Sequence, residues 1–159
     1  MPPEAPFFFS IAALSASVAG FAGLVAAFRR GEGLRSIDLY RLQEIVEFAF
    51  ANALTALSVV AVATALGMPG TVRIAGVGII AYLLGHSLGL FLRLRKLGLP
   101  RERPWVTTVM IIDIAALVLG ISCAAYGATP LLQVLLILLL ARPMIAFLFV
   151  LGSLETNDS

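Results

Sequence analysis

Five ionisable residues lie inside long apolar stretches of this sequence, where such residues are rare. They are Glu44, Glu47, His86, Asp113 and Arg142. A charged side chain is costly in hydrocarbon, so those that remain usually face protein or water and often belong to a proton or ion path. A histidine side chain also titrates near physiological pH. These residue types indicate either proton or ion transport or buried ion pairing.

Helical spacing places these residues on faces with small or polar neighbours. The faces comprise Glu44, Glu47, Ala51, Thr55 and Ser58; then Gly78, Tyr82, His86, Gly89 and Arg93; then Asp113, Ala116 and Gly120. Such faces should turn toward other helices rather than toward lipid. Counting at about 1.5 Å per residue puts the charged groups in one layer, roughly 5 to 14 Å below one membrane surface.

Arg142 needs a counter-ion at that depth, and Asp113 is the nearest candidate. Glu47 and His86 could complete a transport or polar network with this pair, whereas Glu44 and Arg93 are interpreted as interfacial residues. One alternative is that the pair of Arg142 and Asp113 only fixes the register of two helices. Another is that the long side chains extend toward the interface.

Composition shows what kind of elements must hold these residues. Of 159 residues, 60% are hydrophobic and 13% are charged, and the mean hydropathy is +1.03. A soluble domain is usually about half apolar and about a quarter charged, and a small one buries only about two-thirds of its surface. The bilayer must therefore act as part of the solvent.

Apolar runs predict an all-α polytopic bundle of transmembrane helices in a single domain, residues 1–151, followed by a short polar tail, 152–159. Each run has the roughly 20 residues that a span needs. Arg142-Pro143 interrupts the last run, so a re-entrant hairpin is an alternative there. The second helix could begin near Ile37 and project beyond the membrane. The five predicted spans are 7–28, 44–66, 72–92, 105–126 and 131–151.

Basic residues near span ends predict the orientation. Nine lie in the two segments 29–43 and 93–104, and only Arg73 lies on the opposite side. The N-terminus is therefore expected outside and the C-terminus in the cytoplasm of a bacterial inner membrane. Some of these residues could contact anionic lipid headgroups, or they could simply set the topology. The candidates for headgroup contact are Arg29, Arg30, Arg93, Arg95 and Lys96.

Other function classes find no support in the motifs. The one cysteine, Cys123, permits no intramolecular disulfide and no cysteine-based metal cluster. The sequence contains no glycine-rich phosphate loop, nucleophile elbow or helical histidine pair. We therefore expect no enzymatic activity, no metal or other cofactor, and no nucleic-acid partner.

Small residues recur where helices could approach closely. They serve either packing within one bundle or an interface between subunits, so a homo-oligomer or a partner membrane protein is expected beside membrane lipids. The stripes are Ser10, Ala13, Ser17 and Gly20; Gly78, Gly85 and Gly89; and Ala116, Gly120 and Ala124.

The first third of the chain resembles small uncharacterised multi-span bacterial inner-membrane proteins. The segments that carry the resemblance are Ala19-Gly20-Phe21-Ala22-Gly23-Leu24-Val25, Arg29-Arg30 and Arg41-Leu42-Gln43-Glu44-Ile45-Val46-Glu47. The resemblance implies no activity and no functional residues.

Two functions follow from the polar layer. The first is a small transporter or channel that moves protons or small ions, acting as a homo-oligomer. The alternative is a non-catalytic membrane scaffold or regulatory subunit of a larger complex. Water-accessible space reaching His86 and Asp113 would favour transport, whereas a sealed bundle with an exposed small-residue face would favour the subunit.

Overall fold

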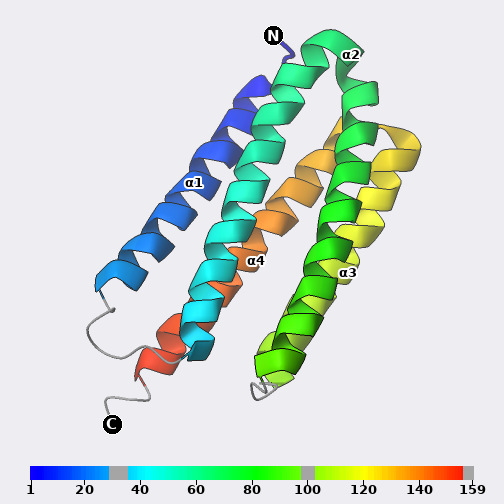
Figure 1. Ribbon diagram of the computed structural model, residues 1–159. Helices are drawn as coiled ribbons and strands as arrows, with labels where there is room; N and C mark the ends of the chain where they lie inside the picture. Colours follow the sequence, from blue (N-terminus) through cyan, green and yellow to red (C-terminus); the bar gives the residue numbers. More distant parts are fainter. Residues whose placement is uncertain (29–35, 98–102, 156–159) are drawn as a thin grey trace.

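The computed structural model describes the backbone of residues 1–28, 36–97 and 103–155, and the side chains of 1–28, 39–89, 92 and 107–150. These residues form a bundle of α-helices, and none of them lies in a strand. Figure 1 shows the helices running roughly along one another. The helices are α1 (Ala5–Phe28), α2 (Ser36–Leu97), α3 (Arg103–Tyr126) and α4 (Thr129–Glu155).

Helix α2 folds back on itself at Gly67, so it consists of two arms (Figure 1). The first arm is 36–66 and the second arm is 68–97. Gly67 has φ 70° and ψ 163°, a conformation that glycine adopts without the steric penalty of a Cβ atom. Pro69 follows in the first turn of the second arm, where its missing N–H costs nothing. The predicted turn at 67–70 is therefore where the chain reverses.

A second glycine ends α3. Gly127 has φ 65°, and its N–H donates a hydrogen bond to the Cys123 carbonyl at 2.9 Å. A left-handed glycine of this kind commonly terminates a helix. Helix α4 begins two residues later and runs unbroken past Pro143 to Glu155. The alternative of a re-entrant hairpin around Arg142-Pro143 is therefore wrong.

All four helices are long and apolar enough to cross a membrane. The predicted ranges 44–66 and 72–92 fall within the two arms of α2, which is one of these four helices, and the other three predicted ranges overlap α1, α3 and α4. Large apolar side chains such as Phe21, Ile111 and Leu148 remain exposed on the outside of the bundle. Helices that are apolar on every side are expected where lipid surrounds them. The all-α membrane bundle predicted from the sequence is confirmed to that extent.

The main core contains residues from all four helices, and much of it lies where α1, the first arm and α4 meet. It combines small residues with branched and aromatic ones, so that neighbouring helices approach closely. Its most buried members include Phe8, Ala56, Val72, Ala116, Leu132, Leu135 and Leu136. This packing places the first arm between α1 and α4, and so turns one of its faces toward Arg142.

The second arm packs against α3 through glycine. A Cβ atom on Gly76 would lie 2.8 Å from the Gly120 carbonyl oxygen and 2.8 Å from the Ala124 nitrogen. Contacts this short leave no room for any side chain. We call this backbone contact, formed by Gly76, Gly120, Cys123 and Ala124, the glycine crossing.

The predicted small-residue stripes differ in whether they make close helix contacts. Gly120 lies in the glycine crossing, but a Cβ atom on Gly78, Gly85 or Gly89 would meet open space. Among the described residues, none therefore packs closely against those three glycines as predicted, and Gly76, two residues before Gly78, makes the close contact with α3 instead. The stripe of Ser10, Ala13, Ser17 and Gly20 lies exposed on the outer face of α1.

Candidate functional site

Arg142 of α4 lies between two carboxylates in the interior of the bundle. Its Nη2 atom is 3.2 Å from Glu44 Oε1 and 3.4 Å from Asp113 Oδ2, and its Nε atom is 3.0 Å from Asp113 Oδ1. The exposed fractions of the three residues are 3% for Arg142, 5% for Glu44 and 8% for Asp113. One guanidinium therefore links three helices, with Glu44 on α2, Asp113 on α3 and Arg142 on α4.

His86 joins this group from the second arm. Its Nε2 atom lies 3.0 Å from Glu44 Oε1, the oxygen that Arg142 also contacts. Glu44 thus receives a guanidinium from α4 and an imidazole from the opposite arm of its own helix. We call Glu44, His86, Asp113 and Arg142 the charged cluster.

Phe48 covers the cluster one helical turn after Glu44. The Arg142 Cζ atom lies 3.4 Å from the centroid of the Phe48 ring, close enough for a cation–π interaction. The His86 ring meets the same ring edge-on at 4.5 Å between centroids, and Tyr82 meets it at 5.4 Å. The Phe48 ring therefore contacts both the guanidinium of Arg142 and the imidazole of His86.

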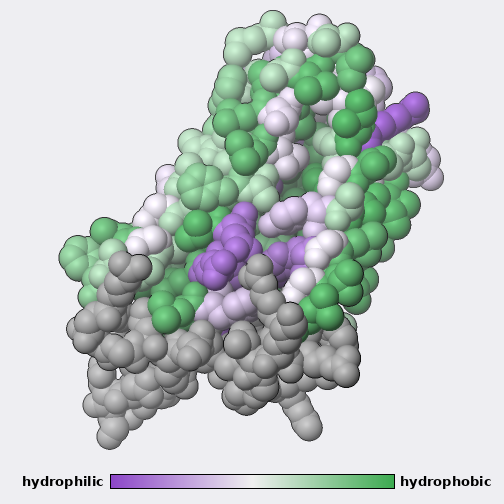
Figure 2. Space-filling model, in the orientation of Figure 1, coloured by the Kyte–Doolittle hydropathy of each residue, from purple (hydrophilic) through white to green (hydrophobic). Residues whose placement is uncertain are grey.

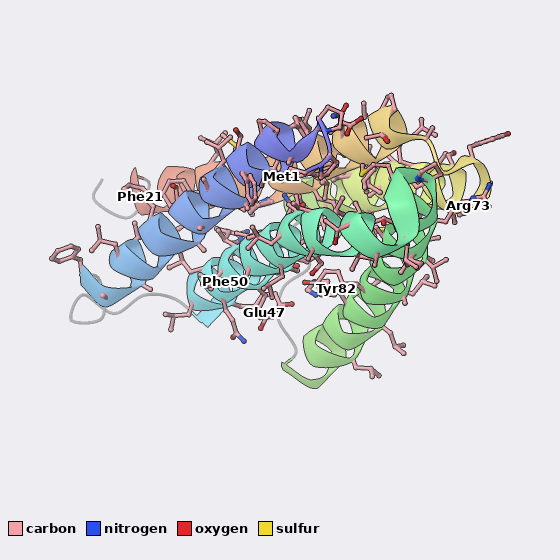
Figure 3. The ribbon with its side chains drawn as sticks, turned by 90° about the horizontal axis from the view of Figure 1, so that it is seen from above. Met1, Phe21, Glu47, Phe50, Arg73 and Tyr82 are labelled. Atoms are coloured by element: carbon pink, nitrogen blue, oxygen red, sulfur yellow. The ribbon has the colours of Figure 1, made fainter. Side chains whose placement is uncertain are left out.

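Three of the four residues predicted for the polar network lie in the cluster, and the fourth does not. Glu47 is only half-buried and accepts a hydrogen bond from Gln43 Nε2 at 2.7 Å. Figure 3 shows Glu47 in the gap between the arms of α2. The predicted pairing of Arg142 with Asp113 is present in the structure.

Glu44 takes the place that was predicted for Glu47, so its interpretation as an interfacial residue is wrong. Three residues correspond to about 300° of helical rotation, which leaves the two side chains roughly 60° apart. Packing of the first arm against α4 decides which of them points inward. Arg41, one turn earlier, is likewise buried within α2 rather than part of a loop.

Asn52 is a further buried polar residue that the sequence patterns did not single out. Its Nδ2 atom donates to Ser15 Oγ at 3.1 Å and to the Leu136 carbonyl at 3.2 Å. Asn52 therefore connects the first arm with α1 and α4. Its Oδ1 atom has no hydrogen-bond partner among the residues that the structure describes. A lone asparagine in an apolar run was the available signal, but the predicted stripe passed through Ala51 and Thr55 beside it.

A groove of about 330 Å³ lies between the two arms of α2, with α4 at its floor. Figure 2 shows the hollow between the arms and hydrophilic residues below it. Phe48 and Tyr82 line the groove and also contact His86, so they separate it from the charged cluster. A second, much smaller void of about 10 Å³ touches Glu44 and Arg142 themselves.

The described side chains form no candidate metal site. Among them, no group of three or more histidine, cysteine, aspartate or glutamate residues is arranged to hold an ion. The residues predicted to contact lipid headgroups, Arg29, Arg30, Arg93, Arg95 and Lys96, lie outside the described side chains.

Comparison with known protein families, with curated proteins and with solved structures found no match to this chain. The resemblance of the first third to small bacterial inner-membrane proteins therefore stays a prediction. The structure defines the described part of the chain as all-helical, with helices long and apolar enough to cross a membrane.

Proposed function

We propose that this protein is a small membrane transporter for protons or small ions, and that the charged cluster binds the transported ion. The observation that carries the proposal is the composition of the cluster, in which two carboxylates and an imidazole meet one guanidinium inside the bundle. With both carboxylates ionised and the imidazole neutral, these four side chains together carry one negative charge, and a charge without a partner is costly in a low-dielectric interior. One bound proton or one monovalent cation would remove it.

The contact between His86 and Glu44 is where a proton would bind. Its two atoms lie 3.0 Å apart, so a proton on the imidazole is held next to a carboxylate oxygen. Among the described residues, Glu44 contacts His86 and Asp113 interacts with it, while Arg142 contacts both of these carboxylates. Tyr82 lies beside the His86 ring and is in turn influenced by the charge of Glu47. Gain or loss of one proton changes the attraction between the two arms, which is how ion binding can be coupled to movement.

The structure favours a transporter over an open channel. A water needs a cavity of roughly 10 to 15 Å³, and the void at Glu44 and Arg142, about 10 Å³, is at that lower limit. The larger groove is bounded on the side of the cluster by Phe48 and Tyr82. Ion movement through the described part of the chain therefore requires a change in helix packing, as in alternating access.

The finer topology is part of this proposal. We propose five membrane crossings, at 7–28, 44–66, 72–92, 105–126 and 131–151, with the N-terminus outside and the C-terminus in the cytoplasm of a bacterial inner membrane. Support comes from the reversal at Gly67 and from Figure 1, in which α1 begins and α4 finishes at opposite ends of the bundle. We further propose a homo-oligomer, supported by the exposed stripe of Ser10, Ala13, Ser17 and Gly20.

A flux assay in proteoliposomes tests the function. An imposed pH or ion gradient should dissipate with the unaltered protein. It should not dissipate with Glu44→Gln or with the double variant Asp113→Asn, His86→Ala. Glu47→Gln is the matched control, because Glu47 lies one turn away outside the cluster, and flux should persist. Ordinary flux in both cluster variants would refute the proposal.

The alternative is a non-catalytic scaffold or regulatory subunit, and one observation favours it. Arg142 is engaged by Glu44, Asp113 and Phe48 together, so the cluster could hold three helices in fixed register without moving ions. Flux would then be absent from the unaltered protein. Replacing Ser17 with Phe on the exposed face of α1 would instead release a partner that co-purifies with it.

A further inference from the structure

The groove between the two arms of α2 has the size and lining of a small-molecule site. Its volume of about 330 Å³ lies at the lower end of the roughly 300 to 1,000 Å³ usual for ligand pockets. At about 30 Å³ per water-sized group, it holds roughly eleven non-hydrogen atoms. Leu54 and Ile74 stand at its rim and are 63% and 56% exposed. An apolar rim of this kind opens the groove to the lipid phase.

Polar atoms lie on the inner wall of this otherwise apolar groove. Asn52 lines it and is 2% exposed, and its Oδ1 atom is a buried acceptor with no partner among the described residues. Buried polar atoms nearly always have a partner, so an exception calls for an explanation. The Thr55 hydroxyl donates to the Ala51 carbonyl at 2.8 Å, which leaves its oxygen free only to accept. The inner wall therefore offers acceptors, and Ser58 and Tyr82, which line the same groove, carry hydroxyl groups that can donate or accept. A ligand hydroxyl, which both donates and accepts, suits this lining.

We propose that this groove binds a neutral lipid-soluble molecule with one hydroxyl group and a hydrocarbon body of about ten carbons, a size that follows from the volume of a water-sized group. The hydroxyl donates to the acceptors of the inner wall, Thr55 Oγ1 and, once the Asn52 side chain turns toward the groove, Asn52 Oδ1. The hydrocarbon lies along Val59, Ile79 and Leu139. A charged ligand fits poorly, because no described side chain that lines the groove is ionised at neutral pH. This inference goes beyond the proposed transport function and does not rest on it.

Photolabelling of the full chain in phosphatidylcholine nanodiscs tests the proposal. The probe is a decanol-length alcohol that carries a diazirine near the end of its chain, and mass spectrometry locates the labelled residues. Label should concentrate on segments 51–62 and 71–82. Unlabelled decan-1-ol should compete about fivefold to tenfold better than decyl methyl ether, since one hydrogen bond contributes about that factor. Equal competition by the two compounds would show a crevice filled by any hydrocarbon, and would overturn the proposal.

Two glycines of the second arm provide a matched pair of variants. A Cβ atom on Gly78 or on Gly85 meets nothing within 4 Å, but only Gly78 lines the groove. Gly78→Leu should fill the groove and reduce labelling at least fivefold, whereas Gly85→Leu should leave labelling unchanged. Equal effects of the two variants would contradict the proposal. If Gly78→Leu fails to fold, the competition between alcohol and ether decides alone.

The labelling experiment and the flux assay can fail independently of each other. Labelling is measured without a gradient, and Glu44→Gln, which should abolish flux, leaves all the residues that line the groove in place. Selective labelling in a protein that moves no ions would retain the groove as a ligand site and remove only the transport function.

Discussion

The second arm of α2 is held in two different ways at two places along its length. Near the turn, the glycine crossing brings its backbone directly against α3, with no side chain between them. Farther along, His86 reaches the first arm through one polar contact to Glu44. Between these places the two arms of α2 separate enough to leave the groove. Backbone packing thus fixes the second arm to α3, whereas side chains connect it to the first arm at that level, through the contact of His86 with Glu44 and through the ring of Phe48.

This difference suggests which part of the molecule can move. A contact between backbones depends on shape and does not respond to pH or to ions. A contact between an imidazole and a carboxylate changes strength when one proton is gained or lost. We therefore expect the second arm and α3 to move as one unit relative to the first arm, with the charged cluster as the contact that changes.

The largest effect should come from Arg142→Met. This change leaves Glu44 and Asp113 buried without their common cation, and breaking a buried pair in this way costs about 3–5 kcal/mol. Thermal unfolding in mild detergent should show a large fall in the midpoint. The triple variant Glu44→Gln, Asp113→Asn, Arg142→Met removes all three charges and should recover most of the loss. A triple variant no more stable than Arg142→Met would mean that charge is not what the cluster contributes.

A smaller but clear effect is expected at the glycine crossing. Gly76→Ala places a methyl group 2.8 Å from two backbone atoms of α3, so the helices must separate, at a cost of about 1–3 kcal/mol for overpacking. Gly78→Ala is the matched control, because the same methyl group meets open space two residues away. Thermal unfolding of both variants checks the expectation. If they unfold alike, the close approach of the second arm and α3 does not contribute to stability.

Much of the fold could be predicted because hydrophobicity and turn residues are local properties. The run of apolar residues locates α1, α3 and α4, and Gly67 and Gly127 mark the reversals. The identity of the close-packed glycine could not be predicted. Gly76 and Gly78 are two glycines of the same helix arm, and the sequence does not tell which of them faces α3. The tertiary packing decides that Gly76 does.

The candidate site was predictable in its chemistry but not in full detail. The pairing of Asp113 with Arg142 could be predicted, because the two residues have opposite charges and similar estimated depths in the membrane. The choice between Glu44 and Glu47 depends on the rotation of the first arm about its axis. That rotation is set by packing of Phe8, Ala56 and Leu135 in the core, and no local pattern in the sequence reveals it.

The smallest effect is expected at Glu47, which lies one helical turn from the charged cluster. Glu47→Gln removes a half-buried charge whose partner among the described residues is Gln43, one helical turn away. A change away from the core and from the charged cluster is expected to alter stability by about 0.5 kcal/mol or less. Glu44→Gln three residues earlier removes the carboxylate that receives both Arg142 and His86, so its thermal midpoint should fall several times further. Equal shifts in the two variants would place the first arm in the other rotation, with Glu47 facing Arg142, and the connection between the two arms would then belong to Glu47.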